Sequence, residues 1–315
     1  MTPSHSSTNT TNSKTMAKNN GKALNLLIVP AILASFMFWT LDQSLPLYLL
    51  GQVAGILFFM QSFILLHEFG HNSFFKTSAL NTFFGHIISY FVFIPFWNWR
   101  QIHDLHHKWT GWRDRDPTTE KTFSARLSPK QTKLINFCWK YHVPLFTIGY
   151  RLGIYWKLEK LKRHLSQQDY RICVINMLGM MLVYATLAYF FWPKLVLLIP
   201  AVLFSFVLTD VISLSQHSNI EMPVSEGKDV SPLKYVEQAR YSRSLILPPL
   251  ISEYIVFNFN YHEAHHCYPG LPCYYLPRIN HGSSNAYAFW PWLKKVKSIP
   301  GVDFVFMTSK DRSQF

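Results

Sequence analysis

The chain has 315 residues, of which 49% are hydrophobic, 17% aromatic and only 15% charged. Soluble domains usually carry roughly 25% charged residues, so this composition argues against an ordinary soluble protein. The net charge of +13 would fit nucleic-acid binding, but the Lys and Arg residues lie between long apolar runs, as in the cytoplasmic loops of membrane proteins. We therefore expect a membrane protein and no nucleic-acid partner.

The first part of the chain predicts a tail and two membrane crossings. Residues 1–22 are polar and basic, which predicts a disordered cytoplasmic tail ahead of one membrane domain over residues 23–315. Residues 23–40 and 45–66 are long enough and apolar enough to span. Two crossings return the chain to the cytoplasmic side at the segment His67-Glu68-Phe69-Gly70-His71.

The middle of the chain predicts segments that do not cross. Residues 79–97 are apolar but stand between two histidine clusters, so we expect them to dip into the membrane or lie along it. His86, within this stretch, is expected to be a packed histidine rather than a ligand. Residues 98–171 are rich in basic residues and predict a cytoplasmic loop, in which residues 134–156 favour an interfacial helix.

The last crossings form a hairpin. Residues 172–191 and 195–215 are apolar and are joined only by Trp192, Pro193 and Lys194, which predicts a tight extracytoplasmic turn. Residues 244–259 are apolar, are interrupted by two prolines, and lead into a third histidine cluster. The expected fold is all-α, with four transmembrane helices, a cytoplasmic helical cap, and both termini and the site on the cytoplasmic side.

Histidine spacing is the strongest functional signal. Three clusters contain eight histidines: His67 and His71; His103, His106 and His107; His262, His265 and His266. Residues at i, i+3 and i+4 leave one face of a helix, and imidazole is a common ligand of iron, zinc and copper. One metal rarely takes more than about six ligands, so the pattern predicts two metals. Redox-active iron acting on oxygen and a lipid-borne substrate suits this set.

Two other classes of protein use similar signals. His67-Glu68-x-x-His71 is also the pattern of zinc metalloproteases, with Glu68 as general base, and it occurs on spanning helices of intramembrane proteases. That class needs a later Leu-Asp-Gly ligand motif, which is absent, and it leaves the other clusters unused. A metal transporter without enzymatic activity would place its ligands along the membrane path rather than at its edge.

With these motifs the chain resembles the membrane-bound fatty acid desaturase family, a superfamily that also contains hydroxylases and carotenoid ketolases. The resemblance covers residues 45–280. It rests on His67-x-x-x-His71, on His103-x-x-His106-His107 followed by Asp116-Pro117, and on Asn260-Tyr261-His262-x-x-His265-His266. The Pro- and aromatic-rich sequel after the third cluster is also similar to acyl-lipid desaturases.

The resemblance implies a di-iron centre, O2 as co-substrate, and removal of two hydrogens from an acyl chain of a lipid or thioester. Hydroxylation or ketolation by the same centre remains an alternative. An external electron donor such as a ferredoxin or a b-type cytochrome is implied, because no His-Pro-Gly-Gly haem motif occurs. Relatives use one more histidine after the last span, where His217 stands, and some carry an Asn where this chain has Ser213.

We expect no catalytic residue apart from the metal ligands, but several residues to support them. A ligating imidazole usually donates its other N–H to a carboxylate or carbonyl. The candidates for this role are Glu68, Asp104, Asp210, Asn260 and Glu263. Asp210 lies two helical turns before His217 and is ionisable inside an apolar run, so we expect it to bond a histidine or a metal-bound water. Asp116 precedes a proline and could simply begin a turn.

Overall fold

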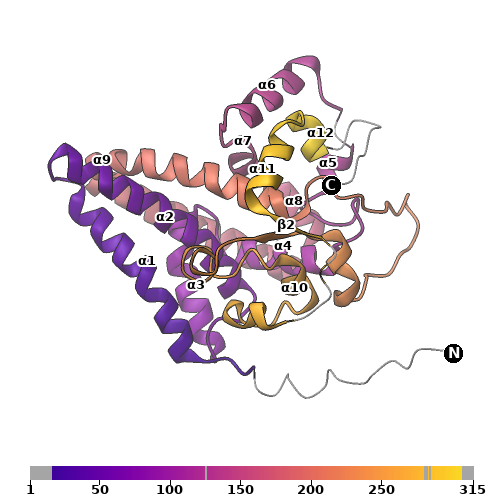
Figure 1. Ribbon diagram of the computed structural model, residues 1–315, viewed down its shortest axis with the longest axis horizontal. Helices are drawn as coiled ribbons and strands as arrows, with labels where there is room; N and C mark the ends of the chain where they lie inside the picture. The colour runs from indigo at the N-terminus through magenta and orange to yellow at the C-terminus, as the bar shows by residue number, and fades with distance from the viewer. Residues whose placement is uncertain (1–15, 125, 280–282, 284, 307–315) are drawn as a thin grey trace.

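The computed structural model describes residues 16–124, 126–279, 283 and 285–306, and these are largely helical (Figure 1). The α-helices are α1 (Asn20–Thr40), α2 (Leu45–Gly70), α3 (Ser78–Val92), α4 (Phe96–Trp109), α5 (Glu120–Ser124), α6 (Pro129–Lys140), α7 (Leu145–Tyr150), α8 (Leu158–His164), α9 (Gln167–His217), α10 (His262–Cys267), α11 (Phe289–Lys297) and α12 (Gly301–Phe306). The π- and 3₁₀-helices are η2 (Arg151–Tyr155), η3 (Tyr235–Tyr241), η4 (Ile251–Ile255) and η5 (Cys273–Arg278). A short parallel pair, β1 (Ser244–Ile246) and β2 (Ala286–Ala288), is the one departure from an all-α fold in the described part.

The first helix and the segment before it contact the rest of the protein. Residues 1–15 lie outside the described residues, whereas α1 begins at Asn20, three residues before the expected start at 23. The Asn19 backbone N–H donates to the Tyr274 hydroxyl at 2.8 Å, and the Ala17 carbonyl accepts from the Tyr275 hydroxyl at 3.2 Å. These contacts tie the segment before α1 to η5.

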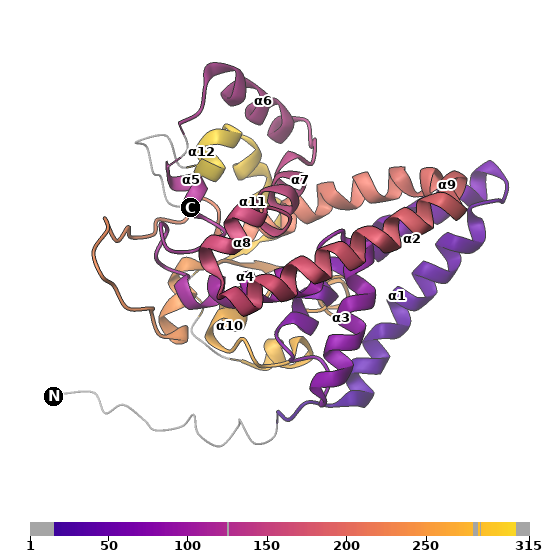
Figure 2. The same cartoon turned by 180° about the vertical axis from the view of Figure 1, so that it is seen from behind.

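Three described helices, α1, α2 and α9, are long and apolar enough to cross a membrane. Helix α9 has 51 residues and would be roughly 75 Å long if it were straight. Both of its ends nevertheless reach α4: Asp169 lies 3.4 Å from Gln101, and the His217 ring lies 4.7 Å from that of His106. The helix therefore doubles back, as Figure 2 shows.

The reversal of α9 lies at the predicted hairpin. Phe191 leaves helical geometry with φ −128° and ψ 16°, and Pro193 follows. Lys194 forms an ion pair with Asp42 in the turn between α1 and α2. The two halves of α9 thus supply the two apolar segments expected from residues 172–191 and 195–215. The turn between α1 and α2 and the reversal of α9 meet at one end of the bundle.

The pair α3–α4 could form one further crossing only as a bent unit, because the two helices meet at 99°. Phe93 ends α3 in the left-handed region with φ 61°, and Pro95 starts the next helix. Residues 79–97 are therefore not a straight span. The bend turns α4 back toward the end of α2 and brings the second histidine cluster against the first.

The single interfacial helix expected over residues 134–156 is wrong. The segment divides into α6, α7 and η2. His142 takes a positive φ of 56° between α6 and α7, and Pro144 cannot donate a backbone N–H to continue the first helix. The fragments pack differently: the inner face of α6 meets α11 and α12, whereas α7 lies against the second half of α9.

Helix α2 is central to the bundle, and nearly every residue from Phe58 to Gly70 is buried. A Cβ on its Gly55 would lie 2.7 Å from the Met37 sulfur and 2.9 Å from the Ala201 Cβ. Small residues allow spanning helices to approach this closely. Gly55 therefore sets the separation of α1, α2 and α9 at their shared contact.

We expect Gly55→Leu to destabilise the bundle by about 1–3 kcal/mol or more, because side-chain atoms would overlap both neighbouring helices. A lower melting temperature in detergent and a lower yield of monodisperse protein would be the readouts. Gly179→Leu is the matched control, since a Cβ at Gly179 in α9 meets nothing within 4 Å. Equal melting temperatures for the two variants would contradict this account of the packing.

Candidate metal centre

The structure brings all nine predicted histidine ligands into one buried region. They come from four helix segments: the end of α2 (His67, His71), α4 (His103, His106, His107), the end of α9 (His217) and α10 (His262, His265, His266). Seven of the nine are buried, and His71 and His217 are partly exposed. His86 lies elsewhere, half-buried with its ring 4.9 Å from that of Phe96, as expected of a packed histidine.

The ring nitrogens form two groups. The first contains five histidines whose potential ligand atoms lie within 4.8 Å of one another: His67, His71, His103, His107 and His265. Within it, the Nε2 atoms of His71 and His103 are 2.8 Å apart, those of His103 and His107 3.2 Å, and those of His107 and His265 3.1 Å.

The second group contains His106, His217 and His266, whose ligand atoms meet the same criterion. His262 joins it, because its Nε2 lies 2.9 Å from that of His217 and 3.1 Å from that of His266. The remaining side of this triangle, from His266 to His217, is 3.0 Å. Ligand nitrogens about 2.1 Å from a metal and at right angles to each other lie about 3.0 Å apart, so these spacings fit metal coordination.

Hydrogen bonds behind the rings leave the Nε2 lone pairs pointing inward. The His217 Nδ1–H donates to the Tyr241 carbonyl at 2.8 Å, and His266 Nδ1 faces the Gln238 side-chain oxygen at 3.0 Å. Both rings therefore carry their proton on Nδ1 and present Nε2 lone pairs to each other. Two facing lone pairs repel unless a cation lies between them, so this donor set fits a metal ion and does not fit a network of hydrogen bonds.

The histidines of α10 are neutral. Burial, with further contributions from neighbouring imidazoles, lowers the pKa values of His262, His265 and His266 well below the ordinary value. Neutral imidazole is the form that binds metals. In the first group, the Nε2 of His67 is buried and has no hydrogen-bond partner, which again leaves a lone pair for a metal.

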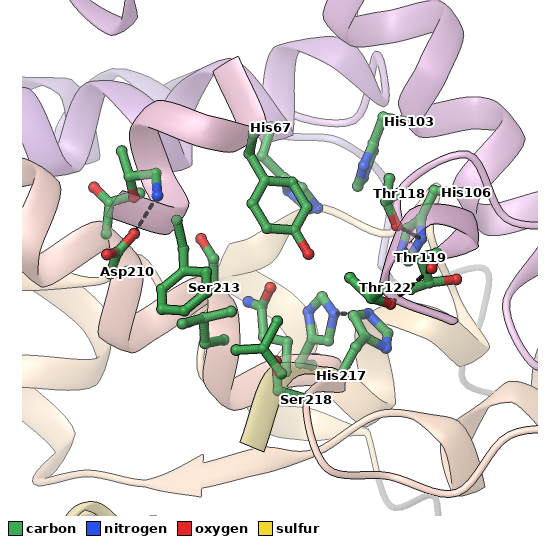
Figure 3. Close-up of a pocket in the computed structure, with 18 of the residues that line it drawn as sticks. His67, His103, His106, Thr118, Thr119, Thr122, Asp210, Ser213, His217 and Ser218 are labelled. Atoms are coloured by element: carbon green, nitrogen blue, oxygen red, sulfur yellow. Dashed lines mark hydrogen bonds between the residues drawn. The ribbon is translucent and has the colours of Figure 1, made fainter. Parts of the chain in front are cut away.

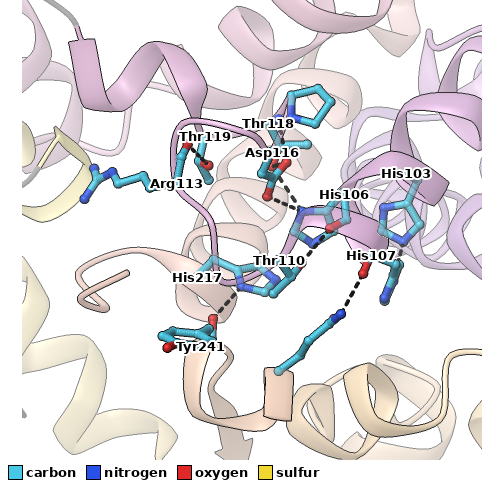
Figure 4. A network of polar contacts seen from close by, with 12 residues as sticks. His103, His106, His107, Thr110, Arg113, Asp116, Thr118, Thr119, His217 and Tyr241 are labelled. Atoms are coloured by element: carbon cyan, nitrogen blue, oxygen red, sulfur yellow. Dashed lines mark hydrogen bonds and ion pairs between the residues drawn. The ribbon is translucent and has the colours of Figure 1, made fainter. Parts of the chain in front are cut away.

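Four acceptors hold the outer nitrogens of four of the rings, and Figure 4 shows two of these acceptors, Asp116 and the Tyr241 carbonyl. Glu68 lies 3.1 Å from His67 Nδ1, and Asp116 lies 2.7 Å from His106 Nδ1. The other two are the Gln238 oxygen and the Tyr241 carbonyl. Only Glu68 was among the expected acceptors. From the sequence, Asp116 was interpreted as the start of a turn, and Gln238 was not identified. No spacing rule could have found Gln238, because it lies in η3, 28 residues before His266.

The loop after α4 is built to hold Asp116. Thr118 donates to the Asp116 carboxylate from its backbone N–H at 2.7 Å and from its hydroxyl at 2.8 Å. Burial alone would raise the pKa of Asp116, but His106 and these hydrogen bonds outweigh it and lower the pKa. The carboxylate is therefore ionised at neutral pH. Lys160, which is buried, donates to the Pro117 carbonyl and pairs with Glu120 at 3.1 Å.

Asp210 bonds no histidine in the described structure, so of the two expected contacts only the one to a metal-bound water stays a prediction. Its carboxylate accepts the backbone N–H of Thr147 in α7. Ser213, one turn before His217, has a buried hydroxyl without a hydrogen-bond partner and lines the same cavity. The physical reason is distance along α9: seven residues of helix separate Asp210 from His217 by about 10 Å, and α7 lies closer.

Three other expected acceptors also point elsewhere. Asn260 bonds the Leu245 carbonyl at 2.8 Å and the Ser252 hydroxyl at 2.7 Å. Glu263 accepts from the Ser283 hydroxyl at 2.6 Å and the Asn285 backbone N–H at 3.1 Å, so it fixes the segment before β2. Asp104 is exposed on α4. Asp104 and Glu263 each follow a ligand directly and Asn260 lies two residues before one, but near neighbours in sequence leave different faces of the chain.

A cavity of about 130 Å³ runs past the histidines (Figure 3). Asp210 and Ser213 lie toward one end, and Thr118, Thr119 and Thr122 lie toward the other. His67 and His217 lie between the two ends, and His103 and His106 lie on the side of the threonines. Much of the remaining wall is apolar or aromatic, from residues that include Phe63, Ile94, Trp99, Phe146 and Tyr155. An apolar chain lying in this cavity would pass directly in front of both histidine groups.

The position of Glu68 argues against the protease interpretation. A general base in a zinc protease must face the metal-bound water. Here one carboxylate oxygen of Glu68 contacts His67 Nδ1, behind the ring, and the other accepts the Cys273 backbone N–H at 3.1 Å. Glu68 therefore supports a ligand rather than facing the metal side.

The fold and the site together define a helical protein with membrane-span candidates and a buried histidine cluster able to bind metal. The sequence model of the fatty acid desaturase family matches residues 43–291. The chain therefore belongs to the fatty acid desaturase family.

Curated relatives agree with this assignment. An "acyl-lipid omega-3 desaturase (cytochrome b5), endoplasmic reticulum" of Arabidopsis thaliana is 26% identical over 279 residues, which cover 80% of this chain and 65% of that protein. An "sn-1 acyl-lipid omega-3 desaturase (ferredoxin)" of Nostoc sp. is 26% identical over 262 residues, or 80% of this chain and 68% of that protein. A "fatty acid desaturase" of Bacillus subtilis is 23% identical over 246 residues, or 76% and 69%. The chain thus spans less than two thirds of the Arabidopsis relative.

Proposed function

We propose that this protein is an oxygen-dependent, di-iron desaturase that introduces a double bond into a fatty acyl chain carried by a membrane lipid or a thioester. The observation that carries the proposal is the convergence of Nε2 lone pairs in two adjoining histidine groups beside an apolar cavity. The curated relatives named acyl-lipid desaturases support the lipid substrate, and their names mention cytochrome b5 or ferredoxin, which supports an external one-electron donor.

Each histidine group would hold one iron ion. The first would use His67, His71, His103, His107 and His265, and the second His106, His217, His262 and His266. Two iron ions bound there would supply the activation of O2 and the removal of two hydrogens from an unactivated chain. The outer hydrogen bonds that the rings donate to Asp116, Gln238, Glu68 and the Tyr241 carbonyl fix ring orientation and raise ligand basicity. The aromatic cavity walls orient the acyl chain and exclude water.

Lipid analysis of a host expressing the gene tests this proposal. We expect new fatty acyl chains lighter by two hydrogens, and we expect purified protein to contain about two iron ions per chain. A product carrying a new hydroxyl or keto group would identify the hydroxylase or ketolase alternative, because mass separates it from a double bond. One zinc ion per chain with peptide hydrolysis would overturn the proposal in favour of a protease.

We further propose that the protein is an integral, multi-pass membrane protein with its metal centre and both termini on the cytoplasmic side. Tags after residue 10, near residue 125 and at the C-terminus should then report the cytoplasmic side. A tag between Trp192 and Pro193 should report the opposite side, since the α9 reversal lies at the far end of the bundle. An external tag near residue 125 would mean that α3–α4 crosses the membrane, contrary to this topology.

A further inference from the structure

A second cleft, of about 350 Å³, lies beside the start of α1. Its walls come from α1, η4 and η5, and from the segment that leads into α10. That segment is shared with the metal-centre cavity: Asn258 and Tyr261 line the cleft, whereas Phe259 and His262 line the cavity. The cleft is therefore separated from the candidate metal centre by one stretch of backbone.

Two cations line this cleft, and each lies near the ring of Tyr275. The Lys22 ammonium lies 4.8 Å from the centre of the Tyr275 ring, and the Arg278 guanidinium lies 5.4 Å from it. Within the described residues, neither cation has a carboxylate at ion-pair distance. Both line the cleft. A lysine and an arginine that line one cleft suit a phosphate, whose oxygens accept charge-assisted hydrogen bonds from such cations.

The cleft also contains a negatively charged side chain. Glu253 in η4 lines the same cleft, is exposed, and forms no ion pair among the described residues. Tyr254, Tyr261 and Tyr274 also line it. A carboxylate and aromatic rings lining one cleft are the groups that bind an ammonium or quaternary ammonium group. The cleft therefore offers both halves of a site for a ligand carrying a phosphate and an amine.

The depth of the cleft matches lipid headgroups. Helix α1 has 21 residues and is about 32 Å long, close to the thickness of the hydrocarbon core, so its first turn lies at headgroup level. Leu250, beside the cleft in sequence, is 73% exposed, and Ile251 and Tyr254 are also exposed. These side chains give acyl chains an apolar surface next to the charged groups.

We propose that this cleft binds the headgroup of a zwitterionic phospholipid. Lys22 and Arg278 hold the phosphate, and Glu253 with the tyrosines of the cleft holds the ammonium. Asn258 is buried, lines the cleft, and its amide nitrogen has no hydrogen-bond partner among the described residues, so it can donate to a headgroup oxygen. This site does not depend on the proposed desaturase activity.

Native mass spectrometry of the full chain in detergent tests the proposal, with dihexanoyl phosphatidylcholine as the probe. We expect one bound lipid per chain, and binding weaker by about tenfold or more in the Lys22→Gln/Arg278→Gln variant. Lys130→Gln/Lys133→Gln on the exposed surface of α6 removes the same charge and should bind as the parent does. An equal loss in both double variants would overturn the site in favour of general charge attraction.

Glu253→Gln tests ammonium binding separately from phosphate binding. It should weaken phosphatidylcholine binding several-fold but leave binding of dihexanoyl phosphatidic acid, which lacks the ammonium, unchanged. Competition by inorganic phosphate as strong as by the lipid would show a free-anion site and overturn the proposal. Binding is measured on protein with and without iron, and the two should agree, so failure of the desaturase proposal would leave this result intact.

Discussion

Replacing His266 by alanine is expected to reduce iron from about two ions per chain to one or fewer and to abolish turnover. Its Nε2 lies 3.0 Å from that of His217 and 3.1 Å from that of His262. The ring is fully buried and stacks on His107 at 4.4 Å. Solvent cannot replace such a ligand at the same place.

His86→Ala is the matched control for this experiment. His86 lies on α3, is half-buried against Phe96, and belongs to neither histidine group. It should leave iron content and turnover at the parental level, with any effect confined to stability. Iron content is measured by atomic emission on monodisperse protein, so that misfolding is not counted as metal loss. Full iron content in the His266 variant would contradict the assignment of this ligand.

The sequence predicted which histidines converge but not how they divide. Spacing at i, i+3 and i+4 predicted that His103, His106 and His107 share a helical face, and α4 is a helix there. Within this face, His106 joins His217 and His266, whereas His103 and His107 join the other group. Neighbouring helical positions diverge by about 100°, and only the packing of α10 against α4 decides which ring meets which partner.

Local signals predicted the crossings better than the cap. The α9 hairpin was predicted from apolar length and Pro193, because these properties act within a few residues. The division into α6, α7 and η2 depends instead on distant contacts, such as Trp139 donating to the Val296 carbonyl at 3.2 Å. Gln238 was missed for the same reason, since its amide reaches the His107 carbonyl at 2.7 Å across 131 residues.

Asp210 shows how a correct periodicity can mislead. Its spacing places it on the same side of α9 as His217, and it does line the cavity. The nearest donor is nevertheless the backbone N–H of Thr147, which no pattern in α9 could reveal. The role expected of Asp210 is filled for His106 by Asp116, from a loop that the sequence marked only by a proline.

We expect Asp116→Asn to reduce iron affinity or turnover about 10–100-fold, the usual loss when a hydrogen-bond partner of a ligating histidine is removed. Asp116 lies 2.7 Å from His106 Nδ1 and is 1% exposed. An amide keeps the shape but removes the negative charge, and the bonds from Thr118 can turn its donor nitrogen toward the ring. His106 would then lose both its orientation and part of its basicity.

Asp114→Asn makes the same chemical change two residues away and serves as the control. Asp114 accepts hydrogen bonds from the Ser225 backbone N–H at 2.8 Å and from the Ser225 hydroxyl. It bonds no histidine in the described structure. The Asp114→Asn variant should have a less stable loop. Its iron affinity should stay within about twofold of the parent's, because no ligand of the metal is affected. The decisive measurement is iron retention against a chelator titration. Equal retention curves for the Asp116 and Asp114 variants would show that Asp116 only shapes the loop, because a general loop defect would affect both alike.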